Sequence, residues 1–202
     1  MIRSRIFITA NLKNMSHIKQ EFIEAQSMLD SFLSDDTHFE RIELAGSIMV
    51  TALKTGHKLV SCGNGGSMCD AMHFAEELSG LYRDRRNALA AVSISDPSHI
   101  TCAGNDFGFD HIFSRYIEAI GLENDVLLAI STSGNSANVI HAALAAKSKG
   151  MKVVGLTGKD GGKLSSLCDV EIRAPYSRYS DRTQEIHIKI IHALIHYIEM
   201  NA

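Results

Sequence analysis

Positive charge is in short supply in this 202-residue sequence, where 20 Lys and Arg residues stand against 23 Asp and Glu and the formal net charge is −3. A protein that holds nucleic acid through its phosphates needs a basic surface, and this composition provides no surplus for one. Long apolar runs are missing as well, since those at 88–94 and 125–130 are far shorter than the roughly 20 residues that cross a bilayer. We therefore expect no binding of nucleic acid and no membrane span.

Cysteine is also sparse, and no C-x-x-C pair occurs. The four cysteines are Cys62, Cys69, Cys102 and Cys168. Their wide separation argues against a disulfide framework and against a zinc ribbon. It fits the reducing environment of the cytoplasm, where we expect the protein to work.

The first 14 residues lack the long apolar region and the small-residue cleavage site of a secretory signal. Helical periodicity begins at Ile18, shortly after a second methionine at Met15. We expect residues 1–14 to be a disordered or non-native extension, with Met15 as the working start. Residues 15–202 are then expected to form a single domain.

Apolar residues make up 45% of the sequence, which is enough to build a full core for one domain of this length. Short β-rich runs alternate with longer helical stretches, and the predicted strands cover 58–62, 90–95, 125–131, 152–157 and 169–173. Apolar strands flanked by helices are typical of a parallel sheet with both faces covered. We predict an α/β protein, a three-layer α/β/α sandwich with a five-stranded parallel sheet. Two N-terminal helices, the second ended by Gly56, and a long C-terminal helix over 182–200 complete it.

Glycine and serine gather in the loops that follow the predicted strands. The first strand runs into CGNGGS at 62–67, the third into STSGNS at 131–136 and the fourth into GKDGG at 158–162. Backbone N–H groups and hydroxyls at a helix N-terminus can hold an anion. The P-loop pattern is not met, because no Ser or Thr follows either Gly-Lys pair, and the dinucleotide pattern fails because Met68 stands where a third glycine is needed. One such loop is typical of any turn, but two after separate strands favour a phosphorylated small molecule as ligand.

Histidine is plentiful, with ten in the chain, and two helices carry the candidates for chemistry. His73 and Glu77 are four residues apart and share a helix face. This spacing suits a metal chelate, a base with its orienting partner, or an ordinary pair in contact with solvent. In the C-terminal helix His192 and His196 have chelating spacing. Gln184 lies eight residues before His192, roughly 12 Å from it along the helix axis. Spacing alone leaves these alternatives open.

Five segments resemble the phosphoheptose isomerases, also called sedoheptulose 7-phosphate isomerases, of the sugar isomerase (SIS) domain family. They are CGNGGSMCDAMHFAEELSG at 62–80, SISDPSHITCAGNDFGFDHIFSRY at 93–116, DVLLAISTSGNSANVI at 125–140, LTGKDGGKL at 156–164 and SDRTQEIHIKIIH at 180–192. The resemblance runs from about Gln20 to the C-terminal end. The first and last segments are more characteristic of this enzyme than of SIS domains in general.

The resemblance implies a cytoplasmic homotetramer that converts D-sedoheptulose 7-phosphate into D-glycero-D-manno-heptose 7-phosphate, the first step toward the ADP-heptose of bacterial lipopolysaccharide. It implies one zinc ion per subunit, bound by His73, Glu77, Gln184 and His192, and a site completed by residues of neighbouring subunits. The implied substrate contacts are Asn64, Gly65, Gly66, Glu77, Asn105, Asp106, Ser131, Thr132, Ser133, Ser136 and Gln184. Such an isomerisation moves a proton between C1 and C2 through an enediol, and we assign Glu77 as the base and His192 as its acid–base partner.

One position departs from the family pattern, and two other readings compete with catalysis. Leu81 stands where these enzymes commonly have Arg, so that contact is either missing or supplied by Arg83 or Arg85. A non-enzymatic SIS adaptor that binds the bacterial replication initiator is expected to lack the full His/Glu/Gln/His set, which is complete here. A sugar-phosphate-sensing regulator is disfavoured because the sequence carries no helix-turn-helix domain. We therefore expect an enzyme.

Overall fold

The computed structural model describes the backbone of residues 2–202 and the side chains of residues 16–202. Five parallel strands form one sheet in the order β2-β1-β3-β4-β5. They are β1 (Leu59–Gly63), β2 (Ala91–Ser93), β3 (Val126–Ser131), β4 (Lys152–Thr157) and β5 (Val170–Arg173). Each strand lies at its predicted place in the sequence, and the predicted five-stranded parallel sheet is confirmed.

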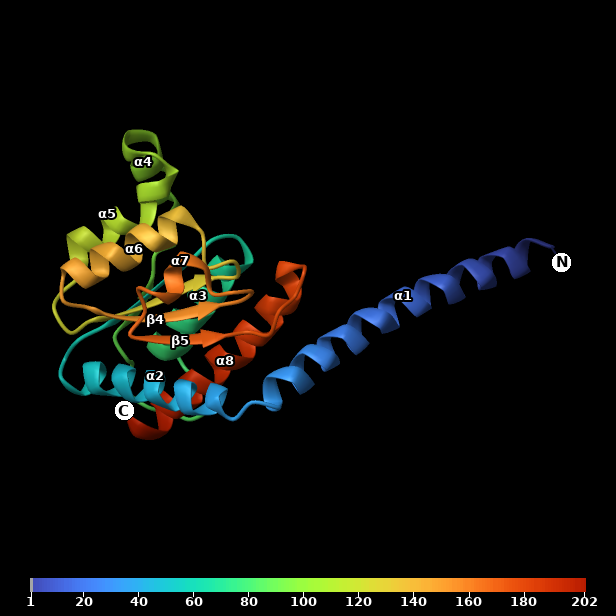
Figure 1. Cartoon of the computed structure of the whole chain (residues 1–202), viewed down its shortest axis with the longest axis horizontal. Coiled ribbons are helices and arrows are strands. Elements are labelled where there is room, and N and C mark those ends of the chain that lie inside the picture. The colour runs from blue at the N-terminus through green and yellow to red at the C-terminus, as the bar shows by residue number, and fades with distance from the viewer. Residues whose placement is uncertain (1) are drawn as a thin grey trace.

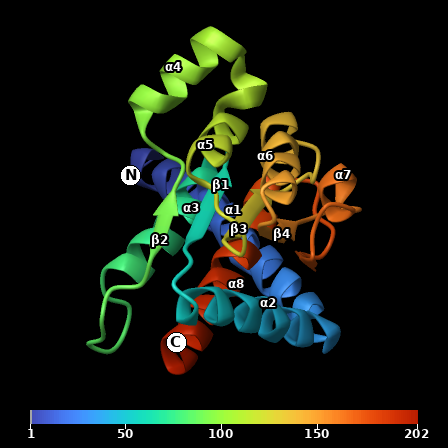
Figure 2. The same ribbon diagram turned by 90° about the vertical axis from the view of Figure 1, so that its left-hand side faces the viewer.

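Helices cover both faces of this sheet, because successive side chains of a strand point to opposite faces. On β3, Leu128 and Ile130 belong to a core shared with α2, α3 and α8, whereas Leu127 and Ala129 belong to a second core shared with α5 and α6. Figure 2 shows α2 and α8 on one side of the strands and α4, α5 and α6 on the other. The helices of the first face are α2 (Thr37–Lys54), α3 (Gly66–Ser79) and α8 (Ser180–Asn201). Those of the second are α4 (Pro97–Phe107), the 3-10 turn η1 (Phe109–His111), α5 (Ile112–Ile120), α6 (Ala137–Ser148) and α7 (Gly162–Ser165). The predicted α/β/α sandwich and its long C-terminal helix are confirmed.

The first helix, α1 (Ile2–Leu33), is longer than predicted and projects away from the α/β body (Figure 1). No proline or glycine interrupts this segment, so nothing in the sequence stops the helix before Ile18. Near the body, the Arg182 guanidinium of α8 pairs with the carboxylates of Glu21 and Glu24 on α1. The side chains of residues 2–15 lie outside those described. A non-native extension over 1–14 and a start at Met15 therefore stay predictions.

Gly56 ends α2 as predicted, with a φ of 84° and an N–H that donates to the Leu53 carbonyl at 3.1 Å. No helix within residues 2–202 is long and apolar enough to cross a membrane.

A pair of glycine variants compares the packing of two turns, one before β1 and one after β3. Gly56 and Gly134 both have positive φ, so an alanine at either position should cost about 1 kcal/mol in backbone strain. A Cβ on Gly56 meets nothing within 4 Å, whereas one on Gly134 would lie 1.9 Å from the Gly161 carbonyl oxygen. Gly134→Ala should therefore lower the free energy of unfolding well beyond the loss in Gly56→Ala. Urea unfolding at one protein concentration measures both, and equal losses would contradict the packing.

Candidate active site

The two loops rich in glycine and serine meet where the sheet reverses its strand order. β1 lies directly beside β3, with Gly63 opposite Ile130, while β2 lies on the other side of β1. The chain leaves β1 into α3 on one face and leaves β3 into α6 on the other face. Divergent helices open a crevice at the carboxyl ends of the strands, which is where ligands bind in open α/β sheets.

A polar pocket of about 330 Å³ occupies this crevice. It is lined by Asn64, Gly65, Gly66, Ser67, Ile130, Ser131, Thr132, Ser136, Ser180 and Gln184. Most of the predicted substrate contacts are among these residues, and Ser67 and Ser180 are lining residues that were not predicted. Among residues 16–202, whose side chains are described, no lysine or arginine lines the pocket. Its donors are therefore neutral hydroxyl, amide and backbone groups.

The pocket is built to receive an anion. It lies at the N-termini of α3 and α6, where the helix dipoles favour negative charge. The Ser131 and Ser136 hydroxyl oxygens are 3.0 Å apart across the second loop. A Cβ on Gly66 would lie 2.6 Å from the side-chain nitrogen of Gln184, so a larger residue at position 66 would displace the end of the Gln184 side chain.

Two asparagines join the loops to each other. The Asn64 side-chain amide donates to the Asn138 carbonyl oxygen at 2.8 Å, and the Asn138 amide donates back to Asn64 at 2.9 Å. Asn138 is 2% exposed and lies in the first turn of α6. This reciprocal pair fixes the spacing between the β1 loop and the start of α6.

A second group of polar side chains lies further along α3 and α8. The Nε2 atoms of His73 and His192 are 3.0 Å apart, with their rings 72° from coplanar. The Glu77 Oε1 atom is 3.6 Å from His73 Nε2. Ligands of a tetrahedral zinc ion with bonds of 2.0–2.1 Å stand roughly 3.3 Å from one another. The His73 Nε2 atom is therefore at about this spacing from both the His192 and the Glu77 donor atoms.

Glu76 orients this group and was not predicted. Its Oε1 atom is 3.1 Å from the Nδ1 atom of His73, and it lies with His73 and Glu77 in a group able to hold a metal. A proton on Nδ1 that points to Glu76 leaves the Nε2 lone pair free for the site. The i,i+3 spacing of His73 and Glu76 is the sequence signal that could have indicated the contact.

Burial and nearby charge shape the electrostatics of this group. Burial, and then the neighbouring His73, lower the pKa of His192 below its ordinary value, which favours a neutral imidazole able to bind a metal. Asp70 lies one turn before His73, and burial raises its pKa to about 6. Its Oδ2 atom is buried and accepts no hydrogen bond within the described part of the chain.

The loop after α3 covers His192 and contains Leu81, the position at which the sequence departs from the family pattern. The Leu81 side chain is exposed to solvent. The Tyr82 ring stacks on His192 with ring centres 6.0 Å apart, and the Arg83 guanidinium lies 5.1 Å from the Tyr82 ring centre. Arg83 is close enough to lower the pKa of His192. Of the two arginines predicted to replace the missing contact, Arg83 is the one beside the site.

Other predicted residues lie apart from both groups. Gln184 contacts the glycine loop and not the His–Glu group, since α8 rises roughly 12 Å between Gln184 and His192. Asn105 and Asp106 are exposed on α4, where the Asn105 amide donates to Asp106 at 2.8 Å. Ser133 accepts a hydrogen bond from the Asn135 N–H at 3.1 Å and does not line the pocket. The roles predicted for these four residues stay predictions.

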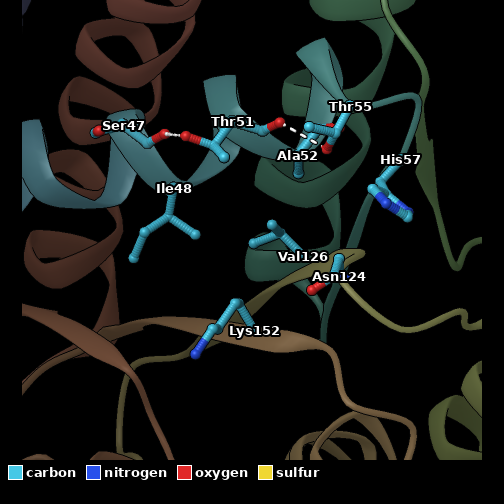
Figure 3. Close-up of a pocket in the computed structure, with 9 residues that line it drawn as sticks. All are labelled: Ser47, Ile48, Thr51, Ala52, Thr55, His57, Asn124, Val126 and Lys152. Carbon is cyan, nitrogen blue, oxygen red and sulfur yellow. Dashed lines mark hydrogen bonds between the residues drawn. The ribbon is translucent and has the colours of Figure 1, made fainter.

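A larger hollow of about 440 Å³ lies at the opposite edge of the sheet, between α2 and the amino ends of the strands (Figure 3). Its Thr51 and Thr55 hydroxyls donate to carbonyls of their own helix. Lys152, which also lines it, pairs with Asp169 at 3.1 Å. Its hydroxyls and its ammonium are thus already engaged, so this hollow offers less chemistry than the smaller polar pocket.

The sequence matches the SIS domain family over residues 22–158. It is 59% identical over 182 residues to the phosphoheptose isomerase of Pectobacterium atrosepticum, which covers 90% of this chain and 94% of that protein. The chain belongs to the phosphoheptose isomerase family. Among solved structures, the phosphoheptose isomerase of Neisseria gonorrhoeae is 40% identical with a TM-score of 0.85 over 92% of this chain and 98% of that one. The enzyme of Francisella tularensis is 34% identical with a TM-score of 0.87 over 93% and 98%.

Membership in the phosphoheptose isomerase family confirms the resemblance and identifies the chain as an isomerase that acts on a phosphorylated heptose. The SIS fold predicted from the motifs is confirmed by the same structures. Relatives with about 60% identity are phosphoheptose isomerases, which favours the enzyme over the replication-initiator adaptor.

Removal of one amide tests whether the asparagine pair holds the two loops. Asn138→Ala deletes both reciprocal hydrogen bonds and leaves the half-buried Asn64 amide unpaired, so the free energy of unfolding should fall by about 2 kcal/mol. Asn105→Ala is the matched control, since Asn105 is exposed and its side-chain amide donates to its neighbour Asp106. Equilibrium denaturation compares the two. If the free energy of unfolding falls no further in Asn138→Ala than in the control, the asparagine pair does not stabilise the two loops.

Proposed function

We propose that this member of the family converts D-sedoheptulose 7-phosphate into D-glycero-D-manno-heptose 7-phosphate, the first step toward the ADP-heptose of bacterial lipopolysaccharide. One observation carries the proposal: the polar pocket and the His–Glu group lie at two levels of the same pair of helices, α3 and α8. From Gly66 to His73 the helix rises roughly 10 Å. An extended seven-carbon sugar with its phosphate ester spans roughly the same length.

The pocket would receive the phosphate of the substrate. The Ser131 and Ser136 hydroxyls and the backbone N–H groups at the two helix N-termini donate to its oxygens. Neutral donors suit a single phosphomonoester better than a polyphosphate. With the phosphate held there, the C1 and C2 atoms of the sugar reach the level of His73 and Glu77.

Proton transfer falls to two side chains. The Glu77 carboxylate removes a proton from C1 of the ketose, the electron pair forms the enediol double bond, and the proton returns to C2 to give the aldose. His192 moves a proton between the oxygens on C1 and C2, so that the carbonyl is exchanged for a hydroxyl without net gain or loss of protons. Both groups belong to the one cluster, where His73 stands 3.6 Å from Glu77 and 3.0 Å from His192.

One zinc ion per subunit is part of the proposal. His73, Glu77 and His192 would hold it, with Gln184 of a neighbouring subunit as the fourth ligand, because Gln184 lies roughly 12 Å from His192 along its own helix. The support is the convergence of two imidazole nitrogens and a carboxylate, together with the carboxylate of Glu76 behind His73. When bound, zinc supplies a positive charge that polarises the carbonyl and enediol oxygens.

We further propose a cytoplasmic homotetramer whose sites are completed by neighbouring subunits. α1 exposes apolar side chains, with Phe22 74% and Ile18 59% exposed. An apolar groove of about 470 Å³ lies among α1, α2 and α8 and is lined in part by Phe32, Phe39 and Tyr197. Apolar surface of this extent favours association with further copies of the chain. The four cysteines are free thiols, which fits a reducing compartment.

Substitution of the two proposed proton carriers tests the function. Glu77→Gln and His192→Gln should each lower kcat for sedoheptulose 7-phosphate at least about 1,000-fold, because each removes a group that must gain and lose a proton. Glu118→Gln is the control, since Glu118 is exposed on α5 and pairs with Arg115 of the same helix. An isomerase assay with fructose 6-phosphate and ribulose 5-phosphate as comparison substrates measures all three. Turnover near that of the unmodified protein in either site variant would refute the assignment.

Metal removal tests the cofactor separately. Dialysis against a chelator should abolish isomerisation, and stoichiometric zinc should restore it, because the converging donors lose the charge that polarises the carbonyl. Elemental analysis before and after dialysis gives the zinc content per subunit. Full turnover in zinc-free protein would remove the metal from the mechanism while leaving the roles of Glu77 and His192 open to the assay above.

A further inference from the structure

The C-terminal end of α3 is closed by a side chain from outside the helix. Helix ends leave their last carbonyl groups without a partner in the helix. Here the Arg86 guanidinium donates from Nη2 to the Glu77 carbonyl at 2.7 Å and from Nη1 to the Leu78 carbonyl at 2.8 Å. Gly80, which follows the helix, has a φ of −96° and so does not form the left-handed cap that commonly ends a helix. Arg86 therefore takes the place of a backbone cap, and one of the two carbonyls belongs to Glu77 itself.

The same guanidinium is tied to α8. Arg86 Nε lies 3.2 Å from Glu199 Oε1, and the two side chains are 14% and 5% exposed. Glu199 lies seven residues after His192, two turns along the same face of α8. Its Oε1 atom also accepts the Arg83 N–H at 3.5 Å, in the loop whose Tyr82 ring stacks on His192. One ion pair thus joins the end of α3, the far end of α8 and the loop that covers His192.

We propose that Arg86 and Glu199 form a clamp that positions Glu77 against His192, and that Arg86 is a positioning residue for the isomerisation. The expected change in kcat rests on the proposed function, whereas the positions of Glu77 and His192 do not. Neither residue lines the phosphate pocket, and in the described part of the chain their hydrogen bonds go to each other and to backbone groups rather than to the imidazoles. Their effect passes through the Glu77 backbone and through the loop at residues 82–83. Removal of one partner of a buried ion pair leaves an uncompensated charge, which destabilises the protein strongly. Arg86 and Glu199 therefore depend on each other.

The kinetic test replaces each partner and separates kcat from KM. In Arg86→Lys the ammonium cannot reach both carbonyls and Glu199 at once, and in Glu199→Gln the charge that holds the guanidinium is lost. We expect kcat for sedoheptulose 7-phosphate to fall roughly 10- to 100-fold, since displacements near 1 Å at reacting groups cost that much. KM should change less than about twofold, because the phosphate pocket is untouched. The double variant should lose no more than the worse single variant.

Controls and a second readout keep the clamp distinct from the function. Arg115→Lys is the matched control, since Arg115 is exposed on α5 and pairs with Glu118 within one helix. If Arg115→Lys is active and both Arg86→Lys and Glu199→Gln keep the kcat of the unmodified protein, the clamp is overturned. The proposed function then still stands. A crystal structure of Glu199→Gln tests the clamp without any activity. It should show the Glu77 carboxylate and the His192 ring further apart than in the unmodified protein, and unchanged separation would overturn the inference even if no isomerase activity is found.

Discussion

Parallel pairing joins β1 to β3 from Leu59 opposite Val126 to Gly63 opposite Ile130, and the site depends on this pairing. It places the carboxyl ends of two strands side by side although more than sixty residues separate them in the chain. Because α3 and α6 then leave to opposite faces, both helix N-termini and both loops rich in small residues face one crevice. The anion pocket is a direct consequence of strand order, and the Asn64–Asn138 pair locks the two loops at the spacing that the strands set.

The contact between α3 and α8 supplies the chemistry. Gly66 has no side chain, so Gln184 can lie against the glycine loop, and this close approach brings His192 to within 3.0 Å of His73 two to three turns away. The second end of the contact is closed by Arg86 and Glu199. The His–Glu group therefore lies between two points at which the helices are held together, one at the pocket and one at the C-terminal end of α3.

Local sequence was sufficient for the elements and for the pocket. β3 is apolar from Val126 to Ile130 because both faces are covered, and Gly56 ends α2 because only glycine adopts its positive φ without strain. The helical pairing of His73 with Glu77 was also legible from their spacing. Glu76, Ser180 and Arg86 were not predicted. Arg86 lies beyond the end of the helix whose carbonyls it binds, whereas the i,i+3 spacing of Glu76 from His73 was present in the sequence but was not used. The extent of α1 was underestimated, since helical periodicity marks a buried face and the N-terminal part of this helix projects from the body.

The sequence by itself determined the strand and helix pattern, the family and the residue types able to do the chemistry, because each of these rests on periodicity or on a contiguous motif. Only the tertiary structure decided which of the spaced candidates meet. Spacing within α8 favoured His196 over Gln184 as the partner of His192, whereas the packed helices put it against His73 of α3. The physical reason is that a metal or proton site needs donors within a few ångströms, and that distance is set by how helices from distant parts of the chain pack on one sheet.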